Sequence, residues 1–219
     1  VFGCYPELIN IRDVSEKKDY LNELVSSYLL RDILAYENIK HSGKIFNLLR
    51  LLAYQIGSEV SYNELGKNLS MSKNTVDKYL DLLSKVFILF KVEGFSRNLR
   101  KEVTKSPKWY FYDNGIRNAI IASYNAIDLR NDTGQLWENY MISERIKYQH
   151  YKQYWTNNYF WRTYDQQEID WVEEREGEIN GFEFKWSETH AREPVAWRKT
   201  YPRAGFTVIN RDNYSEWLD

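Results

Sequence analysis

The chain has 219 residues, of which 43% are hydrophobic, and this is enough to build one large domain or about two to three small ones with buried cores. Its net charge is −1 and its sequence pI is about 6.4. These values exclude a globally basic nucleic-acid-binding protein, so a nucleic-acid partner would have to meet a local basic patch.

Other simple features narrow the class of protein. The single cysteine, Cys4, cannot form an internal disulfide, and no Cys/His metal spacing is present, so we expect a reducing, cytoplasmic setting. The apolar runs are far shorter than the roughly 20 residues that cross a bilayer, and we expect no membrane partner. Because the sequence opens on Val1 rather than Met, we expect it to be part of a longer chain.

The N-terminal part is predicted to be helical. Apolar residues recur at helical spacing between residues 15 and 38, with Ser15 as the expected N-cap and a break at residues 41–43. The pair Arg31 and Asp32 is interpreted as a solvated or inter-helix ion pair, with contact to a nucleotide or a neighbouring domain as the alternative. We take residues 1–40 as an N-terminal helical segment.

Three further helices are predicted over residues 45–56, 61–68 and from Ser72 onward. Ser61 and Glu64 form a capping box, and Ser72 caps the helix that follows a tight turn. This order predicts a helix-turn-helix. The exposed side of the last helix would present polar groups to a DNA major groove. These groups are Lys73, Asn74, Thr75 and Lys78.

A basic hairpin is predicted after these helices. Residues 87–92 and 109–112 have the apolar, aromatic character of strands, and residues 95–108 between them carry five cations against one acid. The five cations are Arg97, Arg100, Lys101, Lys105 and Lys108. With this wing, residues 41–122 are expected to form a winged-helix domain whose basic loop contacts DNA phosphates. The alternative is a domain for protein contacts, with the loop packed on an acidic neighbour.

Carboxylates and a lysine mark the C-terminal part. After a polar loop at residues 123–132, a helix over 133–148 carries Glu138, and strands are predicted at 159–163, 168–172 and 181–186. Asp170 lies on the second strand, and Glu183 and Lys185 share one face of the third. Two carboxylates could bind Mg²⁺ while the lysine stabilises charge, as metal-assisted phosphodiester hydrolysis requires.

The tail completes the expected fold class. A helix over 191–201 and a strand over 206–210 give a small mixed sheet in residues 123–219, and the whole chain is predicted to be α+β or α/β. Phosphate-binding loops of the G-x-x-x-x-G-K-[ST] and G-x-G-x-x-G types are absent, so this chain is not expected to bind ATP by that route.

Two resemblances give these patterns a family context. The order Glu138, Asp170, Glu183-Phe-Lys185 resembles the PD-(D/E)XK nuclease superfamily, with its helix glutamate, strand aspartate and (Asp/Glu)-x-Lys. A set of short segments, in order, is similar to the C-terminal region of bacterial and archaeal AAA+ ATPases. The segments are Tyr5-Pro-Glu7, Tyr28-Leu-Leu-Arg-Asp32, Asn74-Thr-Val-Asp-Lys-Tyr-Leu80, Ser106-Pro-Lys-Trp-Tyr-Phe-Tyr-Asp113, Trp137-Glu-Asn139, Trp161-Arg-Thr163 and Glu168-Ile-Asp170.

The resemblances imply an N-terminal ATPase module in the full-length protein, which would bind ATP and act as partner to this region. The region itself would be an effector that interacts with DNA or protein, with a nuclease-like fold whose activity is lost or not expressed. The alternative is an active Mg²⁺-dependent DNA nuclease, with Asp170 and Glu183 as metal ligands and Glu138 and Lys185 completing the catalytic set. The oligomeric state stays open.

Overall fold

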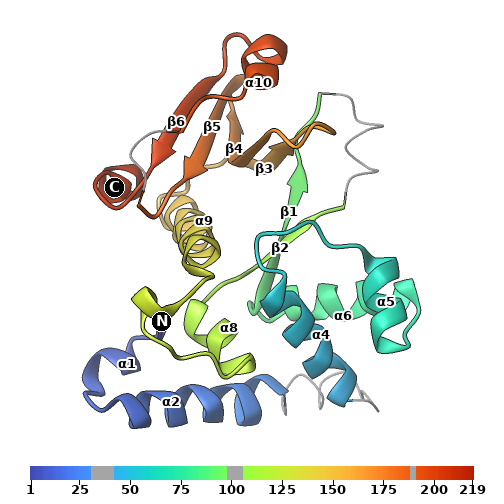
Figure 1. Ribbon diagram of the computed structural model, residues 1–219, viewed down its shortest axis with the longest axis vertical. Coiled ribbons are helices and arrows are strands. Elements are labelled where there is room, and N and C mark those ends of the chain that lie inside the picture. Colours follow the sequence, from blue (N-terminus) through green and yellow to red (C-terminus); the bar gives the residue numbers. More distant parts are fainter. Residues whose placement is uncertain (31–41, 98–105, 188–190) are drawn as a thin grey trace. The chain divides into compact units, whose positions relative to one another are not determined.

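The computed structural model describes residues 1–30, 42–97, 106–187 and 191–219 of the chain (Figure 1). The protein is α+β, and its described strands form one mixed sheet in the order β2-β1-β3-β4-β5-β6. The chain divides into two compact units. The first comprises Val1–Lys91 and Trp109–Asn131, and the second comprises Val92–Lys108 and Asp132–Asp219.

The first unit is mainly helical. In chain order it contains α1 (Glu7–Asn10), α2 (Val14–Glu23), the π-helix η1 (Leu24–Leu30), α4 (Ser42–Tyr54), α5 (Tyr62–Leu69), α6 (Lys73–Lys85), α8 (Asn114–Ile120) and the 3₁₀-helix η2 (Ile127–Leu129). The strands β1 (Leu89–Gly94) and β2 (Lys108–Phe111) each begin or end in it. Residues 1–40 were predicted as a separate N-terminal segment. The described part of this segment, which ends at Leu30, lies in the same unit as α4–α6.

Two helix starts differ from the prediction. The expected cap Ser15 is wrong, because Asp13 caps α2 by accepting hydrogen bonds from the backbone N–H groups of Ser15 and Glu16 at 2.7 and 3.0 Å. The helix thus starts two residues earlier, and a carboxylate satisfies the free amides of its first turn. The break expected at residues 41–43 is also wrong for Ser42 and Gly43, which lie in α4. Arg31, Asp32 and His41 lie outside the described residues.

The α5–α6 pair follows the prediction closely. The Ser61 hydroxyl accepts a hydrogen bond from the Glu64 N–H, and the Ser72 hydroxyl accepts one from the Thr75 N–H at 3.1 Å. The turn between the helices is tight, because a Cβ on Gly66 would lie only 2.7 Å from the Met71 carbonyl oxygen. The apolar side of α6, including Val76, is buried.

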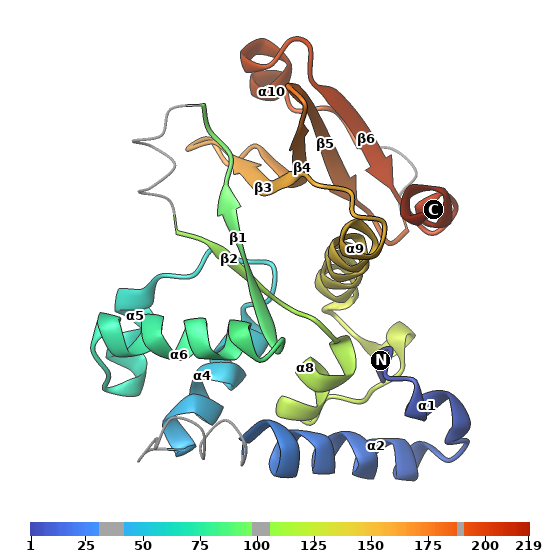
Figure 2. The ribbon, with the colours of Figure 1, turned by 180° about the vertical axis from the view of Figure 1, so that it is seen from behind.

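The second unit contains most of the sheet. Its elements are α9 (Thr133–Tyr151), β3 (Asn157–Arg162), β4 (Glu168–Arg175), β5 (Glu178–Phe184), α10 (Val195–Thr200), β6 (Gly205–Ile209) and α11 (Tyr214–Leu218), together with one end each of β1 and β2. Strands β3, β4 and β5 are antiparallel, whereas β1 pairs with β3 and β6 with β5 in parallel. The mixed sheet predicted from the sequence is confirmed, and Figure 2 shows its strands from behind.

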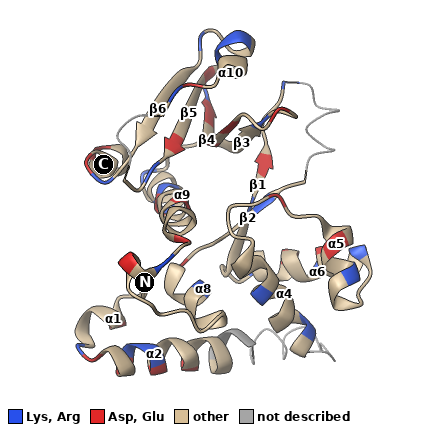
Figure 3. Cartoon of the chain, in the orientation of Figure 1, with Lys and Arg blue, Asp and Glu red and all other residues tan. Residues whose placement is uncertain are grey.

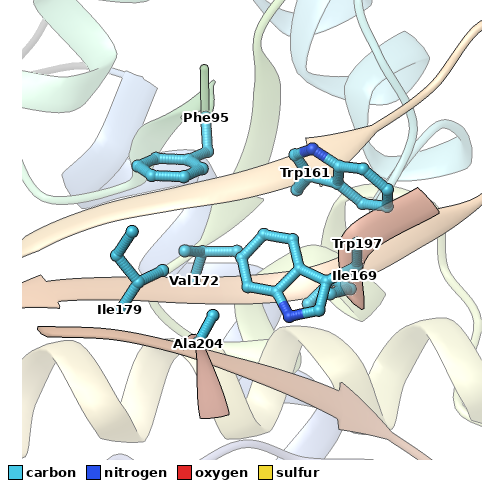
Figure 4. Packing of buried hydrophobic residues seen from close by; sticks show 7 residues of the cluster. All are labelled: Phe95, Trp161, Ile169, Val172, Ile179, Trp197 and Ala204. Carbon is cyan, nitrogen blue, oxygen red and sulfur yellow. The ribbon is translucent and has the colours of Figure 1, made fainter. Parts of the chain in front are cut away.

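One hydrophobic core of the second unit lies between this sheet and α10. Seven buried residues form it, with the Trp197 indole among the side chains of the strands (Figure 4). They are Phe95, Trp161, Ile169, Val172, Ile179, Trp197 and Ala204. The indole stacks edge-on against Trp161 at a centroid distance of 5.3 Å, and aromatic pairs of this geometry add to the free energy of burial.

We expect Trp197→Ala to lower the free energy of unfolding by about 3–5 kcal/mol, because the fully buried indole would leave a cavity that the sheet cannot close. Urea denaturation followed by far-UV circular dichroism measures this loss. Trp155→Ala is the matched control, since that indole is 78% exposed and should change stability little. Equal losses for the two variants would contradict the packing described for Trp197.

Candidate functional site

Four carboxylates and two lysines gather in the second unit. Lys108 is the first residue of β2, Glu138 lies in α9, and Glu168 and Asp170 lie near the start of β4. Glu183 lies near the end of β5, and Lys185 follows that strand. The structure thus brings together the four residues that the sequence predicted for a nuclease site and adds Glu168 and Lys108.

An irregularity in β4 helps to place Asp170. Tyr159 pairs with Val172 and Trp161 with Ile169, so β4 has two residues, Asp170 and Trp171, opposite the single residue between them on β3. This is a β-bulge, and it explains why Ile169 and Val172, three apart, join the same core. Bulges re-aim side chains, and here the extra residue falls at the aspartate of the candidate site.

Asp170 and Glu183 are close to one another on neighbouring strands. The Asp170 Oδ2 atom accepts a hydrogen bond from the Phe184 N–H at 2.8 Å, and Glu183 Oε1 lies 2.9 Å from Lys185 Nζ. Burial raises the pKa of the Asp170 carboxyl, although Lys108 and this hydrogen bond oppose the rise. Burial, and then the Asp170 charge, raises the pKa of Glu183 to about 7 against the pull of Lys185.

Lys108 is the most buried charge of the cluster, with 2% of its side chain exposed. Its ammonium donates a hydrogen bond to Glu168 Oε1, lies 3.7 Å from Glu138 Oε1, and stands 5.2 Å from the centre of the Phe160 ring. Burial alone would lower the pKa of this lysine, but Glu138, Glu168 and Asp170 together outweigh it and raise the pKa above its usual value. Lys108 therefore stays charged at neutral pH.

The sequence placed Lys108 on the exposed wing, and the structure places it elsewhere. An ammonium that is buried against carboxylates cannot also contact a DNA phosphate. Proximity in sequence to Arg100, Lys101 and Lys105 suggested a shared surface, but strand pairing decides the direction of this side chain. Its position in the sequence could have revealed this role, because Lys108 directly precedes the buried run Trp109–Phe111.

The arrangement does not fit a resident metal ion. Within the described residues, no three His, Cys, Asp or Glu side chains converge in a way that could bind a metal. Mg²⁺ prefers oxygen ligands, but here an ammonium lies between Glu138 and Glu168, and a second one pairs with Glu183. Arg162 Nε adds a third cation, 3.8 Å from Glu168 Oε2.

The predicted DNA-contact residues divide into two groups. Lys73, Asn74 and Lys78 are exposed on α6, whose basic positions are blue in Figure 3, whereas the Thr75 hydroxyl hydrogen-bonds with Ser72 at 2.8 Å. On the predicted wing, Arg97 lies 3.9 Å from Glu174. Arg100, Lys101 and Lys105 fall outside the described residues.

A second buried charge network was missed by the sequence analysis. Arg145 on α9 donates to both carboxylate oxygens of Glu173 at 2.7 and 2.9 Å, and Gln149 and Trp171 also donate to that carboxylate. Arg145 and Gln149 are four residues apart and so share a helix face, which is the signal that could have revealed them. Because every oxygen of Glu173 has a partner, we assign this network to the stability of the unit.

Comparison with protein families assigns both halves of the sequence. A model described as a domain of unknown function, DUF8612, matches residues 1–128. The chain belongs to the DUF8612 family. A second domain of unknown function, DUF4143, matches residues 133–214. In this DUF8612 protein, Lys108 comes from the first matched region, whereas the four carboxylates of the cluster come from the second.

Curated relatives carry no functional description. An uncharacterised protein of Mycobacterium tuberculosis is 23% identical over 189 residues, covering 85% of this chain and 42% of the relative. An uncharacterised protein of Haemophilus influenzae is 25% identical, covering 57% of this chain and 32% of the relative, and one of Methanocaldococcus jannaschii is 36% identical, covering 35% and 16%. The chain thus spans less than half the length of these relatives.

No solved structure is significantly similar to this chain. Within residues 1–30, 42–97, 106–187 and 191–219, no helix combines the length and apolar character that crossing a bilayer requires.

We expect Glu183 to make stability depend on pH. Because its pKa is raised from 4.5 to about 7, the folded protein holds a proton that the unfolded chain releases, and the resulting stabilisation is present below pH 4.5 and lost as pH rises to 7. Glu183→Gln should remove up to about 3 kcal/mol of this fall in unfolding free energy. Denaturant titrations at a series of pH values measure the effect.

Glu144→Gln is the control for this prediction. Glu144 is also an ion-paired glutamate, 2.7 Å from Lys147, but it lies outside the cluster. Its substitution should leave the part of the fall in stability that Glu183 causes in place. A Glu183→Gln variant that kept the full wild-type slope would show that the carboxyl titrates normally.

Proposed function

We propose that this chain is the effector region of a longer, ATPase-containing protein and that it engages DNA through a winged helix formed by α4, α5, α6 and the β1–β2 hairpin. In this proposal, residues 123–219 have a nuclease-like fold that serves interaction with DNA or protein and does not cleave. Cleavage is the alternative.

The observation that carries the proposal is the capped, tightly turned pair α5–α6. The turn contains Ser70 in the left-handed conformation, with φ 51° and ψ 52°, and leads directly into the Ser72 cap of α6. A tight turn followed by a longer helix with polar N-terminal residues is the arrangement in which helix-turn-helix proteins read the major groove. Lys73, Asn74 and Lys78 would then face the DNA.

Basic groups around the turn support contact with the DNA backbone. Lys44 Nζ donates a hydrogen bond to the Ser70 carbonyl oxygen at 2.7 Å, and Lys67 and Lys73 line a hollow of about 570 Å³ beside it. Lysines and helix N-termini are common phosphate partners, and such contacts fix the register of a protein on a duplex. This surface therefore has the chemistry that a local nucleic-acid contact needs in a chain of nearly zero net charge.

The length of the relatives and the domains that occur together with DUF4143 support an ATPase partner. Curated relatives are more than twice as long as the matched region, and DUF4143 domains are commonly found with AAA ATPases. An ATPase module in the same full-length chain would bind ATP and act on the region described here. This part of the proposal rests on similarity alone.

The alternative function is Mg²⁺-dependent DNA cleavage. Asp170 and Glu183 would bind the ion, Lys185 would stabilise charge, and Glu138 would orient water or a ligand. The adjacency of Asp170 and Glu183 at a β-bulge favours it. The position of Lys108 weighs against it, because a metal ion at Glu138 or Asp170 would meet an ammonium already held there.

We expect charge reversal on α6 to weaken DNA binding. Lys73→Glu and Lys78→Glu should each lower the affinity for duplex DNA by about tenfold or more and reduce the salt slope by about 1, as the loss of one phosphate contact predicts. Fluorescence anisotropy over a range of salt concentrations measures both quantities.

Lys85→Glu is the matched control on the same helix. It changes the charge equally, but Lys85 lies in the last turn of α6 and pairs with Asp81 at 2.6 Å. Its effect should be the smaller one. Equal effects at all three positions would mean that the α6 N-terminus is not the contact, and unchanged affinity would refute DNA binding through this helix.

We expect no metal-dependent cleavage of single- or double-stranded DNA. Incubation with Mg²⁺ or Mn²⁺, followed by denaturing electrophoresis, compares the wild type with Asp170→Ala. The two proteins should be equally inactive. Cleavage that requires both the metal and Asp170 would establish the nuclease alternative instead.

A further inference from the structure

The ammonium of Lys108 lies where the carboxylates of the site converge. It donates a hydrogen bond to Glu168, lies 3.7 Å from Glu138, and interacts electrostatically with Asp170. Lysine is almost never fully buried in proteins unless it is paired. The Lys108 ammonium is therefore a fixed positive charge inside the site.

We propose that Lys108 is the resident cation of this cluster: its ammonium occupies the place among Glu138, Glu168 and Asp170 that a divalent ion would take, offsets part of their negative charge, and excludes Mg²⁺ from them. The inference does not depend on DNA binding through α6. It concerns the charge state of the second unit alone.

The charge balance of the cluster supports the proposal. Glu138, Glu168, Asp170 and Glu183 are acidic, and they are accompanied by Lys108, Arg162 and Lys185. Each acid therefore already interacts with a cation of the chain. The Lys108 ammonium would repel a divalent ion that entered the cluster. Because Lys108 is buried, little water is present to screen this repulsion.

Lys108 also cannot withdraw easily. It is the first residue of β2, and Trp109, Tyr110 and Phe111 behind it are all buried, which holds the strand in register. Its ammonium stands 5.2 Å from the centre of the Phe160 ring, a favourable place for a cation. To admit a metal, the side chain would have to leave carboxylates and an aromatic face at once.

Lys108 also does not become a metal ligand by losing its proton. The carboxylates raise the pKa of Lys108 despite its burial, so the amine remains protonated at neutral pH. A neutral amine could serve as a metal ligand, whereas an ammonium cannot. The geometry and the charge state lead to the same conclusion.

The test removes the charge and keeps the shape of the side chain. Lys108→Met should bind one Mn²⁺ at least about tenfold more tightly than the wild type, as measured by electron paramagnetic resonance of free Mn²⁺. Lys147→Met, which removes another ion-paired lysine on the same unit, should leave Mn²⁺ affinity at the wild-type value. Adding Glu168→Gln to Lys108→Met should abolish the gain.

A folded Lys108→Met variant that binds Mn²⁺ no more tightly than the wild type would overturn the proposal. If the variant does not fold, acetylation of the wild type followed by mass spectrometry decides. Lys108 should resist labelling equally with and without millimolar Mg²⁺. Labelling that rises with Mg²⁺ would show that the metal displaces the lysine and would refute the proposal.

Discussion

Mutual repulsion of carboxylates is the constraint on which the second unit depends. Glu138, Glu168, Asp170 and Glu183 come from one helix and two strands, and bringing them together costs free energy unless positive charge accompanies them. Lys108 supplies that charge from inside. Burial is the main cause that raises the pKa values of Asp170 and Glu183, and repulsion between the carboxylates adds to it. Carboxyls with raised pKa values cluster at functional sites.

The two faces of β4 are linked through its bulge. On the core side, Ile169 and Val172 pack with Trp197, although their spacing along a regular strand would put them on opposite faces. On the other side of the same irregularity stands Asp170. The bulge therefore determines both the packing of the core and the position of Asp170, and a change that removed the bulge would disturb both.

The sequence predicted the parts of the fold that are fixed locally. Helices α5 and α6 were found because their serine caps lie within three residues of the amides that they satisfy, and β4 and β5 were found because apolar residues alternate along them. Asp13 was missed as a cap because Ser15 is an equally good candidate by residue type. Of the predicted site residues, Asp170, Glu183 and Lys185 come together because they lie on or directly after the neighbouring strands β4 and β5, whereas Glu138 comes from α9.

What the sequence could not provide depends on distant pairing. Lys108 and Glu168 are 60 residues apart, and no periodicity links them. The bulge at Asp170 is a property of the register with β3, which is invisible in β4 alone. The contact of Arg145 with the Trp217 carbonyl oxygen likewise spans 72 residues. Such contacts appear only when the sheet order is known.

The positions of Lys108 and Phe95 show that the family matches and the compact units have different boundaries. Both residues fall in the DUF8612 match, but both are built into the unit that carries the DUF4143 match, one in its charge cluster and the other in its core. A DUF4143 segment excised at residue 132 would lose a core aromatic ring and a buried counter-charge together. The stretch matched by DUF4143 therefore does not contain the whole core or the whole charge cluster of the unit that it forms.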